Sequence, residues 1–337
     1  MSGGGIPYHL RANKHVDRQL FFEFLERYIS KLDLESYGYA TLGGPFLVDL
    51  KAAHARLGIT DLLSIEYDDA VLSRQKFNKP ISLIKCLKMR SGDFITDYSD
   101  IILDFEAKNW IIWLDYAAAA EREQQLSEVA ALIGRLMAGD VVRITVNAAI
   151  HTLATREAYE TTSAFQEAAF TRLQKQLGRF FPVGEAQPFS KRDMTLKGIA
   201  RLLLSSIRIA VLEGLQGAAM SLRVEPISAF RYSDGRHQML TVTLAIVDRK
   251  NPKPMPDTVE NWPYFSGNWD DVREISIPDL SVQERMAIDQ LLFSGSVKEI
   301  SSKLPFKLDS KEAVCERLIQ EYVDHYLRYP SFLQVSY

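Results

Sequence analysis

Acidic side chains stand where predicted strands end, and their type and spacing could do chemistry. Glu66 comes about 20 residues after Gly43 and Gly44, the offset at which an acid reaches the ribose of a bound nucleotide. A carboxylate there can accept hydrogen bonds from two hydroxyls. Asp93 and Asp115 follow two later apolar runs, and Asp115 could orient an acceptor group or take its proton. The pattern predicts a nucleotide-like cofactor beside a reacting group.

The stretch 37–69 has the layout of a nucleotide-binding βαβ unit, with a strand, a glycine turn, a helix and a second strand. Glycines let the backbone turn sharply and approach a ligand, and amides at a helix N-terminus favour anionic or polar groups. The full dinucleotide glycine pattern is missing. A plain strand-to-helix turn at Gly43 and Gly44, and a merely exposed strand-end acid at Glu66, are therefore the alternatives.

Apolar runs and helical patterns alternate through the first half of the chain. This alternation predicts strands over 37–42, 62–65, 82–87, 109–116 and 141–146, with helices over 45–57 and 124–137. Two extended runs, 222–232 and 237–247, flank a Ser-Asp-Gly-Arg turn and predict a hairpin. The expected fold is α/β: a doubly wound, mostly parallel seven-stranded sheet with a C-terminal antiparallel hairpin. Ligands bind outside the carboxyl ends of the strands in such sheets.

The remaining segments predict helical additions to this sheet. We expect an N-terminal helical segment over 1–36, the nucleotide-binding domain over 37–250 with a helical insert at about 155–220, and a Pro-rich loop with a small helical C-terminal unit over 251–337. Arg11 and Lys14 could bind a carboxylate or phosphate, the alternative being a solvated polar segment. The C-terminal unit could pack on the domain, or serve a homodimer or a partner protein.

Composition excludes little about the substrate. Of 337 residues 47% are hydrophobic and 25% charged, and the net charge of −3 neither supports nor excludes nucleic acid. Two cysteines far apart and six scattered histidines predict no disulfide framework and no metal site. The sequence lacks a signal peptide pattern, an apolar run of membrane-crossing length, a Gly-x-Ser-x-Gly elbow and a phosphate loop. We therefore expect a soluble cytoplasmic protein that is neither a hydrolase nor an NTPase.

Four short motifs carry a resemblance to a known family. They are Ile-Pro-Tyr-His-Leu-Arg from Ile6, Leu-Gly-Gly-Pro-Phe from Leu42, Ser-Ile-Glu-Tyr-Asp from Ser64 and Trp-Leu-Asp-Tyr from Trp113. Over about 37–247 the chain resembles the class I, Rossmann-like S-adenosylmethionine-dependent methyltransferases, and within them a bacterial group described as O-methyltransferases. The resemblance implies S-adenosylmethionine as cofactor and methyl transfer to an unidentified small molecule, protein or nucleic acid.

Carried over by position, the resemblance implies a role for each strand-end residue. Methionine would lie over Leu42, Gly43, Gly44 and Pro45, the ribose against Glu66 and Tyr67, the adenine between Asp93 and Phe94, and the methyl-transfer pocket along Asp115 and Tyr116. Tyr116 could stack on a planar acceptor. The chain departs from the family at Leu-Gly-Gly-Pro, which replaces an acid and three spaced glycines. Leu-Asp-Tyr-Ala likewise differs from the Asn/Asp-Pro-Pro-Tyr/Phe of amino-methylating nucleic-acid enzymes.

Two other functions remain open from the sequence. The degenerate glycine turn also suits a catalytically inactive scaffold or interaction protein, either binding S-adenosylmethionine or free of it, because a fold alone does not guarantee activity. A nicotinamide-dependent dehydrogenase is a weaker alternative, since Gly-x-Gly-x-x-Gly is missing.

Overall fold

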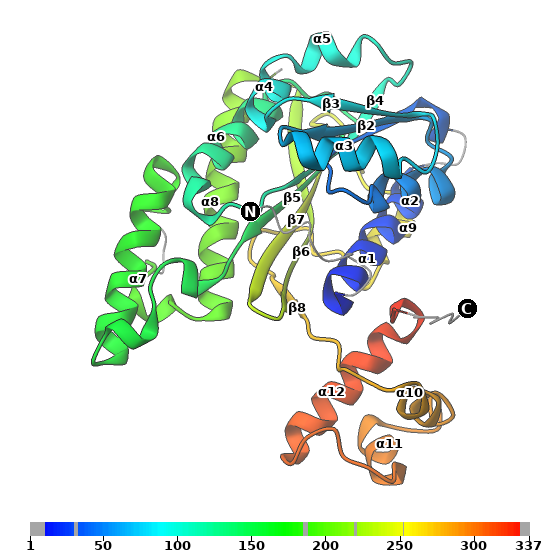
Figure 1. Ribbon diagram of the computed structural model, residues 1–337, viewed down its shortest axis with the longest axis vertical. Helices are drawn as coiled ribbons and strands as arrows, with labels where there is room; N and C mark the ends of the chain where they lie inside the picture. The colour runs from blue at the N-terminus through cyan, green and yellow to red at the C-terminus, as the bar shows by residue number, and fades with distance from the viewer. Residues whose placement is uncertain (1–10, 30–32, 185–187, 219–220, 252, 331–337) are drawn as a thin grey trace.

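One mixed β-sheet forms the centre of the computed structural model, with helices on both of its faces (Figure 1). The structure describes residues 11–29, 33–184, 188–218, 221–251 and 253–330. The motif that starts at Ile6 therefore lies outside the described residues up to Leu10, as does the glycine-rich start of the chain. Among the described residues no helix is both long and apolar enough to cross a bilayer.

The strand order is β3-β2-β1-β4-β5-β7-β6-β8. The parallel strands are β1 (Tyr37–Leu42), β2 (Asp61–Glu66), β3 (Ile84–Lys88), β4 (Asn109–Asp115) and β5 (Val141–Asn147), and the antiparallel hairpin is β6 (Leu222–Asp234) with β7 (His237–Asp248). The predicted doubly wound sheet with a terminal hairpin is confirmed. The structure adds an eighth strand, β8 (Arg273–Ile275), which pairs in parallel with β6. Three residues are too few to show a strand pattern in the sequence.

The central strands β1, β4 and β5 are buried along nearly their whole length. Strands covered by helices on both faces must be apolar in succession rather than in alternation, which explains runs such as Trp110 to Leu114. Their central position places the carboxyl ends of β1 and β4 next to each other.

Helices cover the two faces with separate apolar clusters. On one face α1 (Ala12–Tyr28), α2 (Val48–Leu57) and the short α9 (Asp257–Glu260) pack on the sheet, and α3 (Asp69–Asn78) contacts β2 and β3. On the other face lie α4 (Ser91–Thr96), α5 (Tyr98–Ile102), α6 (Arg122–Ile133), α7 (Thr162–Leu177) and α8 (Leu196–Gly217). The helix α2 begins three residues later than the sequence predicts, because Leu47 before it adopts a positive φ of 50°.

The predicted insert contains α7 and α8, each capped by a threonine side chain, Thr161 and Thr195 respectively. Helix α8 packs closely on α6 at Gly214, where an added Cβ would lie 2.4 Å from the carbonyl oxygen of Ala130. Glycine therefore permits the two helices to approach.

Helices α10 (Val282–Asp289), α11 (Val297–Lys303) and α12 (Glu312–His325) form a separate group after β8 (Figure 1). They surround a small apolar cluster of their own. Its buried members are Ile288, Ile300, Cys315, Ile319 and Tyr322. The predicted segment boundary at residue 250 stays a prediction, and β8, which follows it, belongs to the sheet.

Candidate functional site

The strand order reverses between β1 and β4, because the chain places β2 and β3 on one side of β1 and β4 on the other. At this point Leu42 of β1 pairs with Ile65, and Thr41 pairs with Trp113. A crevice outside the carboxyl ends of the strands at such a switch point is the usual ligand site of open α/β sheets. The structure therefore brings the ends of β1, β2 and β4 together as predicted.

Gly43 is closely packed at this edge. An added Cβ would lie 2.1 Å from Ser64 Oγ, so a larger residue would displace the Ser64 side chain. The Gly43 amide donates to the Ile65 carbonyl at 3.2 Å, and the Gly43 carbonyl accepts from Gln75 Nε2 at 2.7 Å. Packing at a position held by these hydrogen bonds therefore explains why this residue is a glycine. The neighbouring Leu42 and Gly44 are partly exposed, whereas Pro45 is buried.

Glu66 ends β2 as a partly buried carboxylate. Its Oε1 accepts the Asp68 amide at 2.8 Å. Burial raises the pKa of Glu66 above its ordinary value, and the backbone amides of Asp68 and Tyr67 oppose this rise. The adjacent Tyr67 is 57% exposed, with the Arg90 guanidinium 4.9 Å from its ring centre. A hydrogen-bond acceptor and an exposed aromatic ring therefore stand side by side at this strand end.

Asp93 and Phe94 lie in the first turn of α4. Asp93 is exposed, whereas Phe94 has no exposed area and packs edge-on against Tyr98, with ring centres 5.8 Å apart. The ring of Phe94 is thus part of the core and is not presented to a ligand. Because the chain enters a helix directly after β3, the residue following the acid faces inward.

Asp115 ends β4, and its Oδ2 is 2.7 Å from Nζ of Lys14 in α1. The side chains of Lys14 and Asp115 are 6% and 14% exposed. The sequence allows Lys14 to bind a carboxylate or phosphate, and in the structure it contacts a carboxylate of this chain. Arg11 stands immediately before α1 as its N-cap residue and is partly buried.

Tyr116 is 6% exposed and its ring is part of the core cluster. Its hydroxyl donates to Glu128 Oε2 at 2.8 Å, and Gln124 Nε2 donates to Glu128 Oε1 at 3.0 Å. Burial raises the pKa of Tyr116 well above its ordinary value, and Glu128 adds to the effect. Tyr116 therefore anchors the end of β4 to α6 instead of stacking on an acceptor. Glu128, an acid within an apolar helical pattern, was the signal for this contact in the sequence.

Two further buried ion pairs hold α1 in place, one to the sheet and one to α2. Asp17 Oδ1 is 2.6 Å from Arg143 Nη2, with both side chains at most 1% exposed, and Arg18 pairs with Asp49 of α2. Sequence reasoning missed these contacts. The signal was available, because Asp17 and Arg18 share a helix face with the apolar residue Phe21.

The loop after β4 is formed by small residues, among which Ala117 and Ala118 are exposed. Arg122, 1% exposed, holds this loop to the end of β5: it donates to the carbonyl of Ala119 at 2.7 Å and to that of Asn147 at 2.8 Å. Burial lowers the pKa of Arg122 to about 10. The chain therefore presents short side chains directly after Asp115 and Tyr116.

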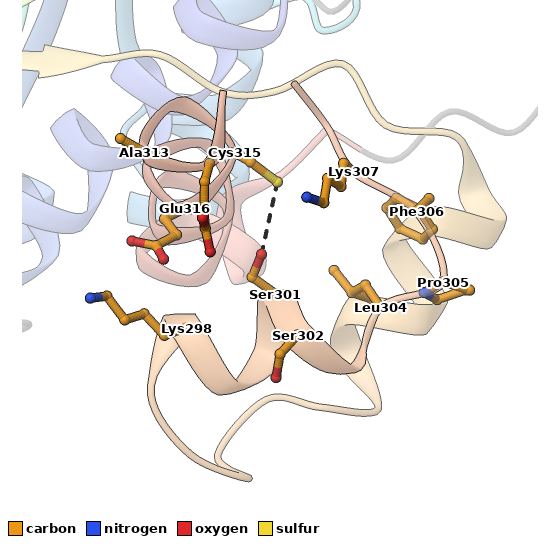
Figure 2. Close-up of a pocket in the computed structure, with 11 residues that line it drawn as sticks. Lys298, Ser301, Ser302, Leu304, Pro305, Phe306, Lys307, Ala313, Cys315 and Glu316 are labelled. Carbon is orange, nitrogen blue, oxygen red and sulfur yellow. Dashed lines mark hydrogen bonds between the residues drawn. The ribbon is translucent and has the colours of Figure 1, made fainter. Parts of the chain in front are cut away.

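A cavity of about 860 Å³ lies in a different part of the molecule, between α11 and α12 (Figure 2). Lys298, Lys307 and Glu316 stand around it, and Ser301 Oγ lies 3.9 Å from Cys315 Sγ. None of the strand-end acids lines this cavity, so it is not a candidate for the chemistry at the carboxyl edge. Within the described ranges, no group of three or more His, Cys, Asp or Glu side chains is arranged to hold a metal ion.

Several solved structures are similar to this chain. NodS, an N-methyltransferase from Bradyrhizobium japonicum, is 10% identical, with 69% of this chain and 97% of that chain covered and a TM-score of 0.34. An O-methyltransferase from Bacillus cereus in complex with SAH is 10% identical, with 68% and 90% covered and a TM-score of 0.32. Similarity at this level carries no argument about ligand or activity.

None of the curated proteins matches the chain. A family model described as "Putative O-methyltransferase" matches residues 6–337, nearly the whole chain, and this match confirms the predicted methyltransferase class. The chain belongs to this O-methyltransferase family.

Proposed function

We propose that the protein transfers a methyl group from S-adenosylmethionine to an oxygen atom of an acceptor. The family match supports methyl transfer, and one structural observation carries the location of the site: Glu66 and Asp115 end the two strands that flank β1 at the switch point of the sheet. When bound, S-adenosylmethionine supplies a methyl group made electrophilic by its positively charged sulfur.

The chemistry of the side chains fits such a cofactor at two of three points. Glu66 offers a partly buried carboxylate for the ribose hydroxyls, and the exposed carboxylate of Asp93 can accept the adenine amino group. Phe94 does not fit, because its ring has no exposed area; Tyr67 is the exposed aromatic ring at this edge. We therefore assign apolar contact with the adenosine to Tyr67 rather than to Phe94.

Asp115 is proposed to orient the acceptor. Its carboxylate is paired with Lys14 at 2.7 Å. The remaining carboxylate lone pairs can accept a hydrogen bond from the acceptor hydroxyl and hold it in line with the methyl group, as transfer requires. When the acceptor oxygen takes the methyl group, S-adenosylhomocysteine is left behind and the hydroxyl proton passes through this hydrogen bond to solvent. The exposed alanines after β4 leave room for the rest of the acceptor.

Calorimetry of the wild-type protein with S-adenosylmethionine tests the cofactor, and the Glu66→Gln variant tests its placement. We expect binding by the wild type and affinity about 10- to 150-fold weaker in the variant, because a hydrogen bond to a charged acceptor contributes about 1.5–3 kcal/mol. The matched control is Glu26→Gln, which removes an acid that pairs with Arg56 on the outer side of α1. Absence of binding by folded wild-type protein would refute the proposal.

A second experiment identifies the acceptor class. Cell lysate is incubated with the protein and methyl-labelled S-adenosylmethionine, then separated into small-molecule, protein and nucleic-acid fractions. We expect one fraction to be labelled by the wild type and labelled at least 10-fold more slowly by Asp115→Asn. Equal labelling by both proteins would remove Asp115 from the proposed role.

A further inference from the structure

We infer that Lys14 is a positioning residue that fixes the Asp115 carboxylate, so that the first turns of α1 form one wall of the site. The inference rests on the proposed function for the identity of the reaction. The contact itself, between a helix near the start of the chain and a strand end 101 residues later, does not depend on that assignment.

The buried face of α1 is charged where the helix begins. Lys14, Asp17 and Arg18 are 5%, 0% and 2% exposed. Charged side chains are rarely buried to this degree unless they are paired. Their spacing of three and four residues places them on one face of the helix, and this face is turned toward the sheet.

Each of the three charges meets a different element. Lys14 contacts Asp115 at the end of β4, Asp17 contacts Arg143 within β5, and Arg18 contacts Asp49 in α2. The contacts of Asp17 and Arg18 hold α1 against β5 and α2 and so fix its rotation and position. In that position, α1 directs the Lys14 ammonium group toward the Asp115 carboxylate at the switch point.

The ion pair with Lys14 limits the orientations that the Asp115 carboxylate can take. An ion pair with atoms 2.7 Å apart and little solvent around it is strongly favourable and restricts the rotation of the carboxylate. Methyl transfer requires in-line geometry, and a displacement of 1 Å can reduce a rate by about 100-fold. Lys14 acts on the reaction through Asp115 and is assigned no contact with the reacting atoms.

A purely structural role for Lys14 makes a different prediction. In that case, loss of the ammonium would lower stability without changing the turnover of the folded protein. The positioning role predicts instead that turnover falls while cofactor affinity changes little, and that the effects of Lys14 and Asp115 are not additive.

The experiment compares Lys14→Met, Lys14→Arg, Asp115→Asn and the double variant Lys14→Met with Asp115→Asn, with Glu26→Gln as the control on α1. Hydrogen exchange of residues 115–121 is measured on the free proteins, since the Tyr116 amide is hydrogen bonded to the Thr145 carbonyl and reports this loop. Affinity for S-adenosylhomocysteine and the labelling rate with excess S-adenosylmethionine are measured in parallel.

In Lys14→Met we expect the amide hydrogens of residues 115–121 to exchange about 10-fold faster and the acceptor to be labelled about 10- to 100-fold more slowly than in the wild type. Lys14→Arg should recover much of the protection from exchange and much of the labelling rate. The double variant should be no slower than Asp115→Asn. Unchanged exchange and labelling in Lys14→Met, or effects that multiply in the double variant, would overturn the inference. If Lys14→Met does not fold, Lys14→Gln, which also removes the charge, takes its place in every comparison. Should the wild type bind no S-adenosylhomocysteine, the proposed function fails, while exchange still decides whether Lys14 fixes this loop.

Discussion

The buried pair of Asp17 and Arg143 allows a sharp prediction about stability. Both side chains are at most 1% exposed, and Arg143 also donates to Thr243 Oγ1 at 2.7 Å and lies over the rings of Phe21 and Trp113. The substitution Asp17→Asn keeps the shape of the side chain and removes its charge. The guanidinium then stays buried without its carboxylate.

The expected cost follows from that uncompensated charge. Breaking a buried ion pair by removing one partner lowers the free energy of unfolding by about 3–5 kcal/mol. With an unfolding entropy of about 2.1 cal/mol/K per residue over 337 residues, the midpoint should fall by about 4–7 °C. The exposed pair of Glu26 and Arg56 is the control, and Glu26→Gln should cost less than about 1 kcal/mol.

Thermal and urea unfolding followed by circular dichroism measure both variants. A double variant, Asp17→Leu with Arg143→Met, replaces the pair by apolar side chains and should recover most of the loss, because neither charge then remains buried. The reasoning is refuted if Asp17→Asn costs no more than Glu26→Gln. It is also refuted if the double variant is less stable than Asp17→Asn.

Three further changes test other parts of the structure. Gly43→Ala should lower the free energy of unfolding in urea by about 1–3 kcal/mol, because the added Cβ would lie 2.1 Å from Ser64 Oγ. Adding Ser64→Ala should restore part of the lost stability. An unchanged stability of Gly43→Ala would contradict the packing described. Glu66→Asp shortens the acid by one methylene and should bind S-adenosylmethionine more weakly than wild type but more tightly than Glu66→Gln, as measured by calorimetry. Burial, with a smaller effect of Arg328, lowers the pKa of His325 to about 4, below its ordinary 6.5. The unfolded chain thus binds a proton before the folded one does, and stability should fall as the pH drops from about 6.5 to 4. This acid sensitivity should be smaller in His325→Phe, and equal slopes in both proteins would refute it.

The order of strands and helices could be read from the sequence because each central strand is a long apolar run followed by a turn. The acids Glu66 and Asp115 could be placed at one edge for the same reason, since parallel strands share their carboxyl ends. The hairpin of β6 and β7 was visible from its turn residues, with Gly235 at a φ of 62°.

The site was harder to predict where side-chain direction matters. Phe94 was expected at the adenine, but the chain enters α4 immediately and its ring turns into the core. Tyr116 was expected at an acceptor, but Glu128, twelve residues later, binds its hydroxyl. Glu128, an acid within an apolar helical pattern, indicated a buried polar contact, but its partner depends on how the helices pack.

The partners of buried charges on distant elements were likewise beyond the sequence. Lys14 and Asp115 were both singled out for their chemistry, yet no spacing rule connects residues on α1 and β4. Their pairing follows from the position of α1 over the sheet, which in turn depends on Asp17 and Arg143. Buried charges on an otherwise apolar helix face are the pattern to look for in similar chains.

The chain after β7 covers part of the outer edge of β6. An outer strand with unpaired backbone groups is a template for strands of other molecules. The carbonyl of Ile227 accepts the Ser266 amide at 2.9 Å, and β8 pairs with Phe230 to Tyr232. A chain shortened to end before residue 264 would lose both contacts, and we expect its uncovered β6 edge to pair with strands of other molecules. Residues 264–275 should therefore be kept in any shortened form of this sheet that is to be studied at high concentration.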